Sequence, residues 1–340
     1  MTQLEGRRRQ ILRVVIDDYI VTAEPVGSEA ARQRHGLEIS SATVRNEMAA
    51  LEELGYLHQP HHSAGRIPTD HGYRVYVDSM VNEEPVSPIE RLRIRRTLTA
   101  TQFDQAVEQA ARALAVITEC ASVVAAPRLA QQVVRHFHLI PIDPRHAMAV
   151  IVTDAEVVEG KTVEFEQPVA PEECDRLSQE ISRRIAGRPL IDLTDRELAT
   201  VIGQAVHHQR VLDQISRLLR ERFRRPRGRV HTEGQANILK QPEFQDARRA
   251  QPVLSVLEQA EAVTELLGDG EESREVRVKI GTENRMGELR DCTVVAATYY
   301  VADRPAGALC VVGPTRMRYG RVISLVRFLA DSLGDTLEQF

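Results

Sequence analysis

Apolar and polar residues alternate at helical spacing over the first 55 residues of the chain. Residues 7–21 are predicted to form an amphipathic helix, whose apolar stripe is Ile11, Leu12, Val15, Ile16 and Tyr19. A second, short helix is predicted from Ser28 to about Arg34, where Gly36 supplies the stop.

The third predicted helix has a well-marked start and end. Ser40 and Ser41 are favoured N-cap residues, and Gly55 closes the helix after about Leu54. The stripe expected to face the core is Val44, Met48 and Leu51.

After Gly55 the pattern changes to short extended segments. Residues 56–60 and 67–69 are predicted strands, and the polar segment 61–66 is the turn between them. A helical segment over residues 72–77 follows. Three helices followed by a two-stranded hairpin is the element order of a winged helix-turn-helix domain.

The rest of the chain mixes helices and strands, and it begins after a linker around Pro85 and Pro88. Strands are predicted at residues 133–142, 147–152, 162–166, 276–280, 292–301 and 307–312. Helices are predicted at residues 89–125, 171–186, 194–225, 247–267 and 321–337, with residues 228–242 irregular. This mixture places the chain in the α+β class.

Length and composition indicate a folded, soluble protein of two or three domains. The chain has 340 residues, of which 42% are hydrophobic. No signal-peptide pattern precedes the charged run at residues 7–9, and the nearly apolar stretch 113–126 is too short to cross a bilayer. We therefore expect a cytoplasmic protein that does not bind a membrane.

The charge balance argues against nucleic-acid binding by bulk attraction. The net charge is −5, and residues 1–80 contain nine Lys and Arg residues against eleven Asp and Glu residues. A DNA-binding surface in this region therefore has to come from local arrangement, with the acidic groups turned away from DNA.

The outer face of the third predicted helix suits the major groove of DNA. Ala42, Asn46 and Ala49 lie opposite the core stripe, and Ser41 and Arg45 flank them. Alanines allow close approach, Asn can pair with adenine and Arg with guanine, and the helix N-terminus can bind a phosphate. The candidate DNA-binding residues are Ser40, Ser41, Ala42, Thr43, Arg45, Asn46 and Ala49. An exposed helix of a small α/β domain has the same spacing, so this pattern alone leaves both interpretations open.

The predicted hairpin adds a second candidate contact. Residues 63–66 place an arginine beside small residues at the predicted tip, from which the side chain is expected to project toward a minor groove or its phosphates. The candidate residues in this hairpin are His62, Ser63, Gly65 and Arg66.

Four segments resemble one known family. SSATVRNEMAALEELGYL (residues 40–57) and HQPHHSAGRIPTDHGYRVYVD (residues 58–78) closely resemble the HrcA family of heat-inducible repressors. GQANILKQPEF (residues 234–244) and GALCVVGPTRMRYGRVISLV (residues 307–326) resemble later parts of the same family. The resemblance spans nearly the whole chain in the same order.

The resemblance implies a dimeric repressor of chaperone operons. Such a protein binds double-stranded DNA at an inverted repeat of the CIRCE type, and a GroEL-type chaperonin promotes its active form. The implied architecture is a winged helix at residues 1–80, a linker at 81–88, a discontinuous GAF-like domain at 89–130 and 230–340, and an inserted α/β dimerisation domain at 131–229. Family members often carry a more basic N-terminal domain than this chain does.

The middle of the chain is also the expected dimer interface on physical grounds. Residues 131–229 carry three predicted strands and two predicted helices that do not complete the C-terminal sheet. The N-terminal region has no long apolar surface beyond its own core, and a two-fold protein matches an inverted repeat. The arginines of residues 217–229 fit a solvated helix end, and contact with DNA or an acidic partner stays open.

No motif supports a catalytic, cofactor or metal site. The histidines of residues 58–62 have no carboxylate or thiol at ligand spacing, which favours polar contacts near DNA over a metal. Gly160–Thr162 lacks the other glycine of a phosphate-binding loop and is expected to be a hairpin turn. Cys292 and Cys310 are expected core residues, and no C-x-x-C pair is present. An enzyme or a ligand-sensing module is therefore the weaker hypothesis.

Overall fold

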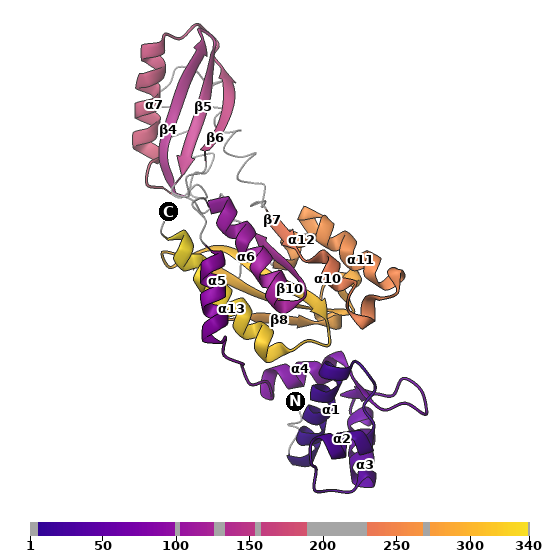
Figure 1. Cartoon of the computed structure of the whole chain (residues 1–340). Coiled ribbons are helices and arrows are strands. Elements are labelled where there is room, and N and C mark those ends of the chain that lie inside the picture. Colours follow the sequence, from indigo (N-terminus) through magenta and orange to yellow (C-terminus); the bar gives the residue numbers. More distant parts are fainter. Residues whose placement is uncertain are drawn as a thin grey trace. The chain divides into compact units, whose positions relative to one another are not determined.

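The protein is an α+β chain that folds as two compact units. One unit combines Met1–Val124 with Val230–Gln339, and the other is Ala125–Arg229. The elements of both are drawn in Figure 1, from a computed structural model. The structure describes residues 6–98, 103–125, 133–153, 158–188, 230–267 and 273–338. Within these ranges no helix is both long and apolar enough to cross a membrane.

The first unit begins with a small module of residues 6–80, called the N-terminal module below. Its elements are α1 (Gly6–Thr22), α2 (Ser28–Arg34), α3 (Ser41–Glu53), β1 (Leu57–His58), β2 (Ile67–Pro68) and α4 (Asp70–Ser79). β1 and β2 pair antiparallel, with Leu57 opposite Pro68. The stripes predicted for the first and third helices are confirmed, since Ile11, Leu12, Val44 and Leu51 are fully buried. This element order is the predicted one.

A five-stranded sheet forms the centre of the rest of this unit, in the order β7-β3-β10-β9-β8. The antiparallel pairs are β3 with β10, β10 with β9, and β9 with β8. α13 packs against β9, β10 and α6. The strands are β3 (Ala121–Ala125), β7 (Val230–Glu233), β8 (Arg277–Ile280), β9 (Cys292–Val301) and β10 (Arg304–Pro314). The longer helices are α5 (Pro88–Thr97), α6 (Phe103–Thr118), α11 (Ala247–Glu258), α12 (Ala260–Leu267) and α13 (Tyr319–Leu337).

Three predictions for this region are wrong in detail. The helical prediction over residues 89–125 misses β3, because Glu119 takes a left-handed conformation that ends α6 before the strand. Residues 228–242 were predicted to be irregular, but they contain β7 and the short helix α10 (Gln235–Ile238). The 3-10 helix η3 (Pro242–Phe244) begins at the last residue of this range. The predicted helix over residues 247–267 is two helices, since Gln259 is extended.

Polar contacts of α4 join the N-terminal module to the sheet. The guanidinium of Arg74 donates to Glu283 Oε1 at 2.8 Å and to the carbonyl oxygen of Val278 at 2.6 Å. Asp70 Oδ2 accepts hydrogen bonds from the backbone N–H and the hydroxyl of Thr282 at 2.8 and 2.9 Å. A Cβ at Gly281 would lie 2.2 Å from the Asp70 carboxylate, so this close approach requires glycine.

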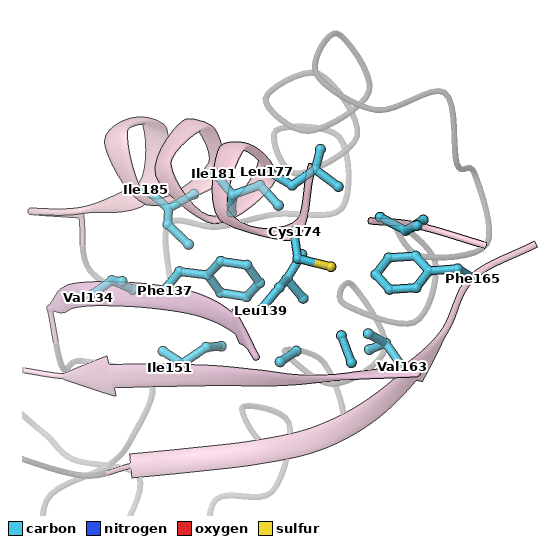
Figure 2. Packing of buried hydrophobic residues seen from close by; sticks show 13 residues of the cluster. Val134, Phe137, Leu139, Ile151, Val163, Phe165, Cys174, Leu177, Ile181 and Ile185 are labelled. Carbon is cyan, nitrogen blue, oxygen red and sulfur yellow. The ribbon is translucent and has the colours of Figure 1, made fainter. Parts of the chain in front are cut away.

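The second unit is a three-stranded antiparallel sheet covered on one face by a helix. Its elements are β4 (Val134–Asp143), β5 (His146–Thr153), β6 (Val158–Glu164) and α7 (Pro171–Ile185), with strand order β4-β5-β6. Figure 2 shows Phe137 and Leu139 of the sheet together with Leu177 and Ile181 of α7 in one buried apolar cluster. Side chains alternate between the two faces along β4, so Phe137 and Leu139 point into this cluster and His138 between them points outward.

One prediction in this unit is wrong and two lie outside the described residues. Gly160–Thr162 is not a hairpin turn, because these residues pair with β5 as part of β6, with Gly160 opposite Val150. The predicted helix over residues 194–225 and the arginine run of residues 217–229 fall outside the described ranges.

Candidate nucleic-acid interface

The start of α3 is fixed by a side-chain cap, as the sequence predicted. Ser40 is extended, with φ −68° and ψ 151°, and its Oγ accepts a hydrogen bond from the backbone N–H of Thr43 at 3.1 Å. The same Oγ lies 2.9 Å from the Thr43 hydroxyl. The cap satisfies one of the free N–H groups of the first turn and fixes the position at which the helix begins. The other free N–H groups of this turn therefore lie at a well-defined helix end.

The two faces of α3 divide as the periodicity predicted. Val44, Met48 and Leu51 are buried, whereas Ala42, Arg45 and Asn46 are exposed. Ser41 and Thr43 are partly exposed, and so is Ala49, which the periodicity placed on the face opposite the core stripe together with Ala42 and Asn46. Within the described ranges, neither Arg45 nor Asn46 has a hydrogen bond or ion pair, so both polar groups are free for an external partner.

Two of the three acidic residues of α3, Glu47 and Glu52, are paired inside the N-terminal module. Glu47 Oε2 lies 3.1 Å from Arg8 Nε, and Glu47 Oε1 lies 4.0 Å from Arg7 Nη1. Glu52 Oε1 accepts the backbone N–H of Gln59 at 3.0 Å, while its Oε2 faces Arg66. Within the described residues, Arg45 and the exposed Glu53 at the end of the helix are the charged residues of α3 that form no ion pair.

Acidic residues on the neighbouring helices are paired as well. The buried Asp18 of α1 contacts His35 Nε2 at 2.9 Å and Arg34 Nη1 at 3.4 Å. On α2, hydrogen bonds from Arg32, then from Gln33, lower the pKa of Glu29 to about 2. Each of these contacts engages a basic side chain together with the acid, so the net charge of the module is unchanged, and the pairing decides only which charged groups stay exposed.

The tip of the hairpin is formed by His61, His62 and Ser63. All three are exposed. Gln59 organises the loop from within, since its Nε2 donates to the carbonyl oxygens of His62 at 3.1 Å and Ala64 at 2.9 Å. His62 and Ser63 thus lie where the sequence predicted, on an exposed loop between the two strands.

The prediction that Arg66 projects freely from the tip is wrong. Its backbone exchanges two hydrogen bonds of 2.9 Å with Val26, which places it at the base of the hairpin. Its Nε lies 2.8 Å from Glu52 Oε2, in a largely buried ion pair without the alignment of a hydrogen bond. Gly65 is equally constrained, because a Cβ there would lie 2.4 Å from the Val26 carbonyl.

Sequence reasoning missed Gln59 and Arg8, which shape the interface without lying on its exposed face. Gln59 stands in a predicted strand, where nothing marks a side chain that turns back to bind its own loop. Arg8 lies 39 residues from Glu47. The only local signal was the basic run at residues 7–9, and a sequence cannot show which acid such a run will meet.

The cysteines of the chain are structural in the described fold. All four are free thiols and buried. Burial raises the pKa of Cys120 to about 12 and that of Cys310 to about 12, so both thiols are neutral at physiological pH. The prediction that Cys292 and Cys310 are core residues is confirmed. Among the described residues no three His, Cys, Asp or Glu side chains come close enough to hold a metal ion.

Fold and interface together define an α+β protein whose N-terminal module exposes one capped helix and one hairpin. Comparison with known proteins then identifies its family. The family model for the HrcA protein C-terminal domain matches residues 104–323. A protein from Symbiobacterium thermophilum named heat-inducible transcription repressor HrcA is 37% identical over 98% of both chains. A protein of the same name from Natranaerobius thermophilus is 36% identical over 99% of this chain and 98% of its own. The chain belongs to the HrcA family.

A solved structure supports the fold alone. This crystal structure, described as that of a hypothetical protein, matches with a TM-score of 0.61 and 23% sequence identity, and it covers 99% of both chains.

Proposed function

We propose that the protein is a cytoplasmic heat-inducible transcription repressor that binds double-stranded DNA. The N-terminal module acts as a winged helix-turn-helix, and α3 enters the major groove by its capped end. One observation carries this proposal: Arg45 and Asn46 are exposed and unpaired on the face of α3 opposite the core. The shared name of the full-length relatives supports it.

The contacts on DNA divide between α3 and the hairpin. Arg45 and Asn46 read base edges, and the small side chains Ala42 and Ala49 let the backbone approach them. Ser40, Ser41 and Thr43 surround the helix N-terminus, where the positive end of the helix dipole favours a phosphate. The hairpin contributes His62 and Ser63 at its tip. Gly65 and Arg66 position the hairpin from its base.

We propose further that the working form is a homodimer that binds an inverted repeat of the CIRCE type. Residues 131–229 are an inserted domain that interrupts a GAF-like domain in the sequence. This inserted domain forms the dimer interface. Its sheet face opposite α7 exposes Ile140 by 52% and Met148 by 41%, and these two residues are paired across β4 and β5. Adjacent apolar side chains on an open sheet face are suited to burial against a second copy.

A mobility-shift titration tests the DNA-binding proposal. The intact protein is titrated against an inverted-repeat operator and against a scrambled duplex of equal length, over a series of salt concentrations. Preferential binding of the operator is expected, with affinity falling as salt rises. Equal binding of both duplexes at every salt concentration contradicts the proposal. Repeating the titration with a purified GroEL-type chaperonin tests whether it increases the active fraction, as the family resemblance implies.

A further inference from the structure

A cavity of about 450 Å³ lies between the end of α1, the end of α6 and the start of α13. Its size is within the range of small-molecule sites. Ile20, Val322 and Leu325 provide part of an apolar wall. No residue of α3 lines this cavity, and the charged groups of the cavity are different from those of the proposed DNA interface.

Two of the cavity's arginines are already engaged. The Nε of Arg316 lies 2.7 Å from Glu243 Oε1, and its Nη1 donates to the carbonyl oxygen of Ile20 at 2.8 Å. Arg321 forms an ion pair with Glu90. These side chains hold α1, α5 and α13 around the cavity, and their charges are largely balanced.

Two other charged lining residues have no such partner. Glu119 and Arg318 line the cavity and are exposed. Neither side chain forms an ion pair within the part of the chain that the structure describes, so they do not neutralise each other. Among the described residues, the cavity lining therefore presents one unpaired anion and one unpaired cation, on separate elements.

The helix ends add to this charge separation. Glu119 directly follows α6, at the negative end of that helix dipole, and Arg318 is the N-cap residue of α13, at the positive end of the other. The N-cap side chain makes no capping hydrogen bond, and the N–H of Tyr319 already donates to the carbonyl oxygen of Met317. Within the described residues this leaves the N–H groups of Gly320 and Arg321 in the first turn of α13 for an anion. Arg318 would attract a simple anion, but Glu119 would repel it. A molecule that carries both a negative and a positive group would be attracted by both side chains.

We propose that this cavity binds a small zwitterion of the free amino acid class. The carboxylate of the ligand is held by Arg318 and the start of α13, and its ammonium group by Glu119 and the end of α6. Its side chain packs against the apolar wall. Because Ile20 is the third residue from the end of α1, the ligand touches the N-terminal module directly.

The test measures ligand binding to the intact protein without DNA, so its outcome is independent of the proposed repressor function. Each of the standard L-amino acids is screened for a rise in Tm, and the best is titrated by calorimetry. We expect at least one to bind with a Kd below about 1 mM, near the weaker end of specific affinities. The analogue without the amino group and the analogue without the carboxylate should each bind about tenfold more weakly or worse.

Variants locate the site. Arg318→Gln and Glu119→Gln should each weaken binding about tenfold or more. Arg248→Gln, at an exposed arginine outside the lining, should bind as the unchanged protein does. The analogue series on the unchanged protein keeps the test decisive if a variant folds poorly. The proposal is overturned if no amino acid binds, if both single-charge analogues bind as well as the zwitterion, or if folded Arg318→Gln and Glu119→Gln bind normally.

Discussion

The Nε of Arg66 lies 2.8 Å from Oε2 of Glu52, so an ion pair ties the base of the hairpin to the last turn of α3. The backbone of Arg66 is also paired with Val26, just before α2. The hairpin is therefore bonded both to the proposed recognition helix and to the segment that leads into α2. Its direction relative to α3 is set by these contacts, although its tip is exposed.

Arg66→Ala should lower both stability and operator affinity. The side chain of Arg66 is only 16% exposed and that of Glu52 is 33% exposed, so the loss should be about 1–2 kcal/mol of unfolding free energy, between the values for surface and buried pairs. Urea unfolding and a mobility shift measure the two effects. Glu52→Gln removes the same pair from the other side and should act in the same direction. An unchanged unfolding curve for Arg66→Ala would show that the pair contributes nothing to the fold.

Arg45→Ala and Asn46→Ala should weaken cognate operator binding by about 1–3 kcal/mol each, because each removes a bidentate contact to a base. Stability should stay nearly unchanged, since neither side chain has a partner within the described fold. Arg248→Ala serves as a control for the loss of one exposed positive charge. Equal losses on operator and scrambled DNA would reassign the residues to phosphate contacts.

Ser40→Ala should destabilise the protein by about 1 kcal/mol, because the backbone N–H of Thr43 loses its capping acceptor. Operator affinity should fall with it, since the start of α3 frays where the phosphate contact is proposed. Ser40→Asp supplies another capping oxygen and should retain most of the stability. Denaturant melts of the three proteins compare the effects directly, and equal midpoints for Ser40→Ala and the unchanged protein would rule out a stabilising cap.

The four thiols should be unreactive in the native protein at pH 8. Burial is the first cause of the raised pKa of each thiol, and for Cys120 and Cys310 the value is about 12, so the reactive thiolate form is scarce in the folded state. A thiol-specific chromogenic disulfide should react slowly before unfolding and release four equivalents in guanidinium. Rapid reaction of any thiol in the native state would mean that its surroundings open readily.

Ile140→Glu should shift the proposed dimer toward monomer, because a charge replaces an exposed apolar group on the open sheet face of the second unit. Sedimentation velocity measures the dissociation directly, and affinity for the full inverted repeat should fall with it, while binding to a half-site stays the same. Gln179→Glu, on an exposed position of α7, is the matched control for an added charge. If the Ile140→Glu variant remains fully dimeric, the dimer interface does not lie on this face.

Local spacing was enough to predict the elements that matter most for the interface. The stripe of Val44, Met48 and Leu51 and the cap at Ser40 depend on residues only a few positions apart, and the structure confirms both. The exposed positions of Arg45 and Asn46 follow from the same periodicity. The family could also be identified from the sequence, because its motifs at residues 40–78 are contiguous.

Strand β3 and the turn before it could not be obtained in this way. Ala121–Ala125 is buried almost throughout, so it shows no alternation of polar and apolar positions that would separate a strand from a helix. Its partner β10 lies far along the chain, with Val123 opposite Cys310. Glu119 ends α6 in a left-handed conformation that neither glycine nor proline announces.

The partners of charged side chains were likewise decided by the tertiary structure. The sequence by itself determined the amphipathic helices, the helix start at Ser40, the hairpin and the family, since these depend on contiguous residues. Only the folded chain brought Arg66 to Glu52, Arg74 to Glu283, and Glu119 and Arg318 to one cavity. These juxtapositions bring together residues up to about 200 positions apart, and they depend on how complete elements pack, which local spacing does not encode.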